Sequence, residues 1–124
     1  MAKRRQRDRR PRDRRPRDEL AAPTSEYRDE EGNVLELRGS LTAGTRRQYA
    51  DTLAGGLHRE DALARATELL FERLAVSWTI AGVPITRQKE LLGRYRMATA
   101  DERTFVRGAM REHCAEHFPE LQAP

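Results

Sequence analysis

The 124-residue sequence has few of the residues and segments that fix a protein's compartment. It contains one cysteine, Cys114, so no disulfide can form within the chain, and a reducing compartment is the simplest expectation. No apolar run approaches the roughly 20 residues that span a bilayer, and the N-terminus lacks the apolar segment of a secretory signal. We therefore expect a cytoplasmic protein that does not enter a membrane.

Residue patterns that carry catalysis or bind metals are also missing. There is no phosphate-binding glycine-rich loop, no serine elbow and no zincin motif. His113 and His117 lie one helical turn apart, but a structural zinc needs four ligands, and the chain has one further histidine, His58. Cys114 has no activating or orienting group at a recognisable spacing. We predict a protein that is not an enzyme and has no metal site and no cofactor.

Charge is divided unevenly along the chain. Residues 1–18 repeat the pattern RRQRD, RRPRD, RRPRD and hold ten basic against three acidic side chains, a net charge of +7, whereas the remaining residues carry −3. The repeat has no apolar residues with which to bury surface, so we expect residues 1–25 to be a disordered arm and linker. Such an arm attracts nucleic-acid phosphate, or it serves only as a solvated leader. The candidate nucleic-acid-binding residues are Arg4, Arg5, Arg7, Arg9, Arg10, Arg12, Arg14, Arg15 and Arg17.

The longest apolar pattern, residues 58–82, predicts the central helix of the fold. Large apolar residues from Leu63 to Trp78 recur at helical spacing, and a helix that is apolar around much of its girth is normally packed on several sides. We predict this helix over 59–80, ended by Gly82 and Pro84. Residues 74–80, LAVSWTI, are rich in β-branched and aromatic residues, so a buried strand is the alternative there.

Shorter patterns predict the other elements. A turn at 31–33 followed by alternating leucines predicts a short strand or hairpin over 27–38. Helices are expected over 43–53, 87–95 and 100–117, preceded by Thr42, Thr86 and Thr99, and Thr99 with Glu102 matches a capping box. VPIT, 83–86, is expected to be an extended linker. The fold class is therefore mainly α: a small bundle of about four helices with an N-terminal strand or hairpin, over residues 26–118, and a flexible tail at 119–124.

The order of these stretches resembles that of the small tail assembly chaperones of long-tailed phages. The resemblance covers roughly residues 34–118 and rests on LELRGSLTAGTRRQY, REDALARATELLFERLAVSW, PIT and the ADE that opens the last helix. It implies a non-enzymatic role in the cytoplasm of an infected bacterium. Proteins of this family coat the long helical tape measure protein and help to bring tail tube protein to it, so those two proteins are the implied partners.

A chaperone for helices needs an apolar groove between its own helices. The candidate partner-binding residues are Leu70, Phe71, Leu74, Trp78, Phe105 and Met110. The same six side chains could instead form the core of the monomer. A second function class is a small nucleic-acid-associated protein that binds DNA or RNA through its arm and dimerises through its helical body, and a third is a structural adaptor without chaperone activity. The oligomeric state is left open.

Overall fold

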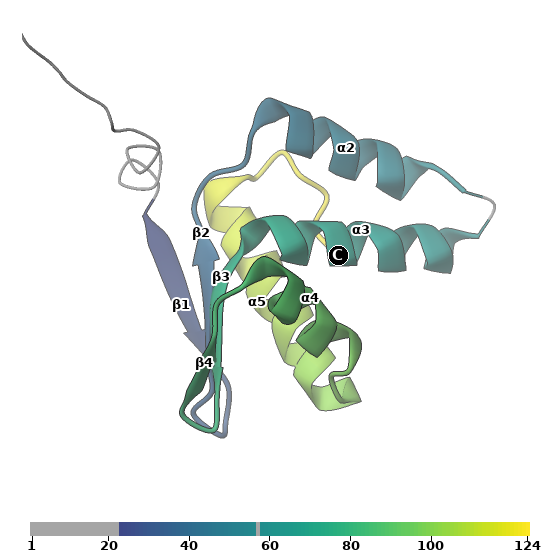
Figure 1. The fold of residues 1–124 in the computed structure, drawn as a ribbon. Helices are drawn as coiled ribbons and strands as arrows, with labels where there is room; N and C mark the ends of the chain where they lie inside the picture. Colours follow the sequence, from purple (N-terminus) through teal and green to yellow (C-terminus); the bar gives the residue numbers. More distant parts are fainter. Residues whose placement is uncertain (1–22, 57) are drawn as a thin grey trace, which may run out of the picture.

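In the part of the chain that the structure describes, a four-stranded antiparallel sheet carries four helices on one of its faces (Figure 1). The computed structural model describes residues 23–56 and 58–124, so the predicted arginine arm lies outside the described residues. The strand order is β1-β2-β3-β4. In chain order the elements are β1 (Thr24–Arg28), β2 (Val34–Arg38), α2 (Ala43–Ala54), α3 (Arg59–Leu74), β3 (Ala75–Ile80), β4 (Val83–Ile85), α4 (Gln88–Arg96) and α5 (Ala100–His117).

The first hairpin confirms the predicted turn and strand. β1 pairs antiparallel with β2, and Tyr27 lies opposite Leu35. The carboxylate of Asp29 closes the turn, because its Oδ1 accepts the backbone N–H groups of Glu31 and Asn33, both at 2.9 Å. The alternation in β2 turns Leu35 and Leu37 toward the helices, where both are fully buried.

The predicted central helix is correct from residue 59 to 74 and wrong beyond it. α3 ends at Leu74, and the backbone of Ala75 is already extended, with φ −70° and ψ 125°. Residues 75–80 form β3, the alternative stated for this segment, because their β-branched and aromatic side chains fit a strand that pairs with β2. The expected linker VPIT is likewise strand β4 over its first three residues.

Gly82 does take a left-handed conformation, but it closes a hairpin instead of ending a helix. Ala81 and Gly82 have φ angles of 52° and 81° and form the two-residue turn between β3 and β4. Two positive φ angles are typical of the turn whose twist matches that of paired strands. The sheet is therefore four strands wide, which the expectation of a helical bundle with one strand or hairpin did not include.

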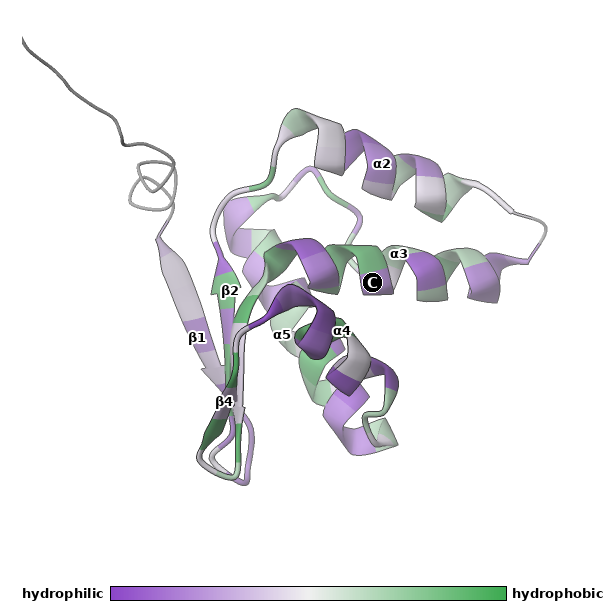
Figure 2. Cartoon of the chain, viewed as in Figure 1, coloured by the Kyte–Doolittle hydropathy of each residue, from purple (hydrophilic) through white to green (hydrophobic). Residues whose placement is uncertain are grey.

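The core lies between the helix-covered face of the sheet and α3, α4 and α5. The Phe71 ring stacks on Tyr95 at 4.9 Å between centroids and meets Trp78 edge-on at 6.0 Å. Figure 2 shows hydrophobic and hydrophilic residues alternating along α3 and α5, as expected for helices packed on one side.

Most of the predicted helix boundaries are confirmed. The Thr42 hydroxyl accepts the Thr45 N–H at 3.0 Å and opens α2. Thr99 and Glu102 form the predicted capping box at the start of α5, which spans the predicted residues 100–117. The predicted cap at Thr86 is wrong, since Arg87 occupies that position before α4 and makes no side-chain cap bond.

Residues 119–124, expected to be a flexible tail, pack against α2 and α5. The Arg46 guanidinium forms an ion pair with Glu120 at 2.6 Å, and the Tyr49 hydroxyl donates to the Gln122 carbonyl at 2.6 Å. At the end of the chain, Arg111 donates to the Pro124 carbonyl at 2.8 Å. The packed structure therefore extends past the predicted boundary at residue 118.

Candidate protein-binding groove

Of the six predicted partner-binding residues, Phe105 alone lines one of the two hollows described below, the acidic one. Five of them are enclosed in the core, with exposed fractions of 0–1%: Leu70, Phe71, Leu74, Trp78 and Met110. Phe105 is partly buried and packs against the edge of the core. The five enclosed side chains could meet a partner only if the core opened, so their placement agrees with the alternative that they form the core of the monomer.

An open apolar groove lies elsewhere, between α2, the first half of α3 and the C-terminal residues. It encloses about 770 Å³. Leu63 lines this groove and is 43% exposed. The apolar lining consists mainly of Leu53, Ala54, Ala62, Leu63, Leu121 and Ala123.

The sequence builds the groove by joining two helices through glycine and by placing small residues between them. α2 ends at the cap residue Gly55, and Gly56 has a φ of 96°, which lets the chain turn back toward α3. Ala54 and Ala62 are too small to fill the space between the two helices at that end. A hollow therefore remains between α2 and α3.

The C-terminal residues form the third wall of the groove. Their position is fixed by the Arg46–Glu120 ion pair and by the bond from Tyr49 to the Gln122 carbonyl. The Arg46 guanidinium also lies over the Phe118 ring, 5.1 Å from its centroid. Sequence reasoning missed this wall, because a short polar end after a helix usually frays.

Charges of both signs surround the apolar lining. Arg59 and Glu60 come from the start of α3, and Glu120 comes from the C-terminal wall. An apolar groove with a mixed charged rim can accept the apolar side of an amphipathic helix while the helix keeps its polar side in water.

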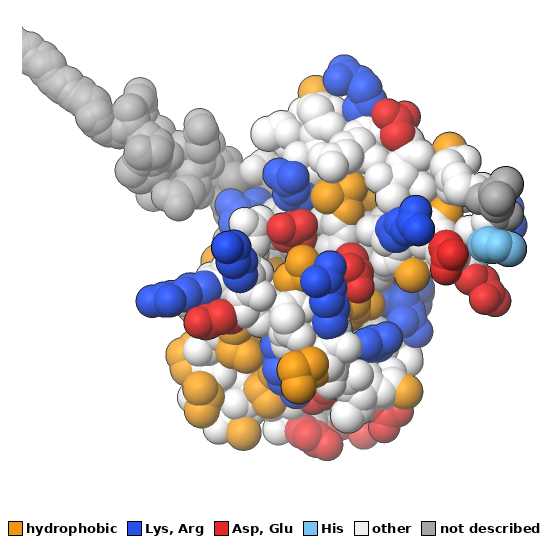
Figure 3. Space-filling model, turned by 45° about the vertical axis from the view of Figure 1, so that its right-hand side comes forward, with side chains coloured by type: hydrophobic (Ala, Val, Ile, Leu, Met, Phe, Trp, Pro, Cys, Tyr) orange, Lys and Arg blue, Asp and Glu red, His pale blue; other side chains and the backbone are white. Residues whose placement is uncertain are grey.

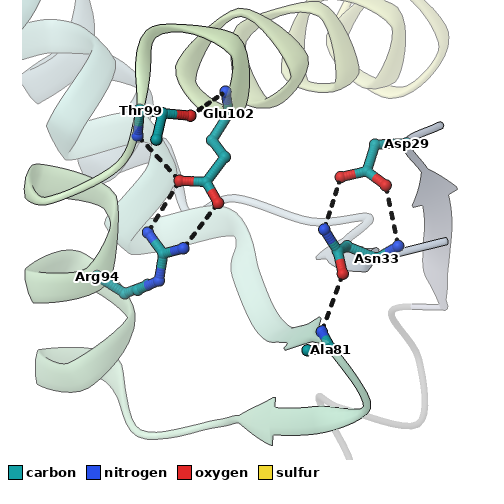
Figure 4. A network of polar contacts seen from close by, with 6 residues as sticks. All are labelled: Asp29, Asn33, Ala81, Arg94, Thr99 and Glu102. Carbon is teal, nitrogen blue, oxygen red and sulfur yellow. Dashed lines mark hydrogen bonds and ion pairs between the residues drawn. The ribbon is translucent and has the colours of Figure 1, made fainter. Parts of the chain in front are cut away.

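A second hollow, about 960 Å³ in volume, is acidic, and two of its carboxylates, Asp29 and Glu102, have structural partners. It lies between the β1–β2 turn and the start of α5 (Figure 4). Glu102 accepts two bonds from Arg94, at 2.7 and 3.1 Å, and these bonds are the main cause that lowers its pKa. Asp29 bonds Asn33, whose side-chain oxygen accepts the Ala81 N–H at 3.0 Å and so connects the two hairpin turns.

Within the histidine and cysteine cluster on α5, His113 connects the helix to the sheet. Both ring nitrogens of His113 are occupied, Nδ1 by the Tyr27 hydroxyl and Nε2 by the Arg38 carbonyl, each at 2.8 Å. Burial raises the pKa of the Cys114 thiol to about 11, so the thiol stays protonated and is a poor nucleophile. Within residues 23–56 and 58–124, no group of three or more His, Cys, Asp or Glu side chains is placed to hold a metal ion.

Comparison with known proteins gave no match. No protein-family model matches the chain, no curated protein matches it, and no solved structure matches its fold. None of the helices in the described part of the chain has the length and apolar character needed to cross a membrane.

Proposed function

We propose that this chain is a non-enzymatic tail assembly chaperone that binds the tape measure protein during phage tail assembly. The observation that carries the proposal is the open apolar groove between α2, α3 and the C-terminal residues, in which Leu63 is 43% exposed. The order of sequence patterns over residues 34–118 supports the same class of protein. The tape measure protein of this family is long and helical, and this groove suits a helix.

The dimensions of the groove are consistent with that ligand. α2 has 12 residues, so it is about 18 Å long at 1.5 Å per residue. A helix lying along it can present apolar residues over two to three turns, at positions i, i+3, i+4 and i+7. Leu53 and Leu63, on the two facing helices, would contact these residues.

The test is co-expression with the tape measure protein of the same phage, followed by affinity purification in moderate salt with nuclease. We expect a soluble complex of the two proteins. L63E places a carboxylate in the groove and should abolish the complex, whereas A64E, at an exposed neighbouring position outside the groove, should retain it. Retention of the complex by L63E would exclude the groove as the binding site, and the absence of any complex with the wild-type chain would refute the chaperone function.

A second candidate function, nucleic-acid binding, is favoured by one specific observation, the net charge of +7 within residues 1–18. The folded part of the chain adds little to this support for nucleic-acid binding. Basic and acidic side chains are interspersed on the face seen in Figure 3, and Arg96 is paired with Glu68 at 2.9 Å. Deleting residues 1–18 should leave tape measure binding intact. If the chain is instead a nucleic-acid-associated protein, the same deletion should abolish nucleic-acid retention at low salt.

A further inference from the structure

Strand β1 forms one edge of the sheet, and its outer side has no partner among the described residues. At its two ends, the Pro23 carbonyl accepts the Gly39 N–H at 2.8 Å and the Asp29 N–H donates to the Asn33 carbonyl at 3.1 Å. Bonded and outward positions alternate along an antiparallel ladder. Thr24, Glu26 and Arg28 therefore direct their backbone N–H and C=O groups away from β2.

The opposite edge of the sheet is protected against pairing, but β1 is not. β4 has three residues with Pro84 in the middle. Ile80 and Val83 flank the turn as the bonded pair, so the next residue, Pro84, faces outward and offers no N–H. β1 contains no proline, and its pairing with β2 shows no bulge. Only β1 can extend the sheet by a full ladder.

We propose that β1 pairs antiparallel with β1 of a second copy of this chain, about a two-fold axis that passes between the two Tyr27 residues. The charges select this register. Centring the pair on Tyr27 places Glu26 opposite Arg28 of the second copy, twice, on the sheet face without helices. Centring it on Glu26 would place two carboxylates opposite each other.

Tyr27, the residue at the two-fold axis, is held in place before the two copies associate. In this register the two Tyr27 side chains form a pair without backbone bonds, whose Cβ atoms in antiparallel sheets are about 4.5–5.5 Å apart. Each Tyr27 is partly exposed and is held from the helix side by its 2.8 Å bond to His113. A fixed ring loses little conformational freedom on association.

Sedimentation velocity of the full chain over a wide concentration range tests the pairing, and we expect a monomer–dimer equilibrium. E26P removes an outward N–H without breaking the β1–β2 ladder and should leave only monomer. E26R should weaken the dimer at least about tenfold, because it faces Arg28 of the second copy. E26R removes the exposed Glu26–Arg28 contact within the chain, at 3.7 Å, but also relieves the opposition of Glu26 and Glu36, so the stability of the monomer should change little.

The double variant E26R/R28E should restore the dimer, because it re-forms both ion pairs with the charges exchanged. D51R, at an exposed position on α2, makes the same change in net charge as E26R and should leave the dimer unchanged. A monomer at every concentration, or a dimer insensitive to both E26P and E26R, would overturn the proposal. Neither result bears on the groove, which lies on other elements.

Discussion

Tyr27 on β1 and His113 on α5 lie 86 positions apart in the sequence and share a hydrogen bond of 2.8 Å. The other ring nitrogen of His113 bonds the Arg38 carbonyl, which can only accept, so Nε2 carries the proton and Nδ1 accepts from the Tyr27 hydroxyl. One neutral tautomer therefore satisfies both bonds. Through these two bonds His113 links the last helix, α5, to both strands of the first hairpin.

The Y27F variant should lower the free energy of unfolding by about 1–2 kcal/mol, because it leaves the buried Nδ1 without a donor. Chemical denaturation at neutral pH measures the change. Y95F is the matched control, since no hydrogen bond of the Tyr95 hydroxyl is found within the described part of the chain, and it should cost less. Equal losses for the two variants would show that the Tyr27–His113 bond contributes nothing specific.

Stability should fall as the pH drops below about 6.5. Burial is the main cause that lowers the pKa of His113 from 6.5, and the neighbouring His117 adds to it. Between the lowered pKa of the folded state and the pKa of the unfolded chain, the unfolded chain binds more protons. The contribution of His113 to the free energy of unfolding is therefore complete above pH 6.5 and decreases as the pH falls. Denaturation curves recorded from neutral to mildly acidic pH measure this slope.

The pH dependence can be assigned to one histidine by substitution. H113Q should reduce the slope near pH 6.5, because the titrating ring is gone. H58Q should leave it unchanged, since the His58 side chain is exposed and makes no cap bond at the start of α3. If the slope persists in H113Q, another group is responsible for it.

Substitutions at the two adjacent positions of the β3–β4 turn should change the stability of the protein in opposite directions. A81G should raise the free energy of unfolding by about 0.5–1 kcal/mol, because it relieves the strain of a φ of 52° and keeps the N–H bond to Asn33. G82A should lower it by about 1 kcal/mol through backbone strain alone, since an added Cβ would have no atom within 4 Å. Thermal and chemical denaturation measure both.

A matched control separates turn strain from the general cost of glycine. A115G makes the same substitution as A81G at an exposed position in α5, where it should destabilise the protein by about 1 kcal/mol. If A81G destabilised the protein as A115G does, the left-handed conformation at Ala81 would be incorrect.

Replacing each of the two phenylalanines among the predicted partner-binding residues by alanine should destabilise the protein to a different extent. F71A should cost about 3–5 kcal/mol, because Phe71 is fully buried between Tyr95 and Trp78. F105A should cost on the order of 1 kcal/mol, because Phe105 is only partly buried at the edge of the core. Chemical denaturation distinguishes the two, and a small cost for F71A would contradict the packing described for the core.

The predicted elements that the structure confirms depend on short-range signals. A capping box needs only Thr99 and Glu102, three residues apart, and it marks the start of α5. The turn at 31–33 and the burial of Leu35 and Leu37 follow from glycine and from alternation within a few residues. The groove could not be predicted in this way, because its walls come from α2, α3 and the chain end.

The sequence by itself determined the uneven charge and, for the described residues, the number of helices and most of their boundaries, because composition, caps and breakers act locally. Only the tertiary structure decided that residues 75–80 are a strand. Their apolar run fits either a helix or a strand, and the pairing with β2, some 40 residues earlier in the chain, makes it a strand. The tertiary structure also decided which apolar residues are enclosed and which remain open. Trp78 is enclosed, with Phe71 of α3 and Arg94 of α4 against its ring. Leu63 is exposed because the residues beside it in the groove include alanine and glycine, and burial depends on the neighbours that folding supplies.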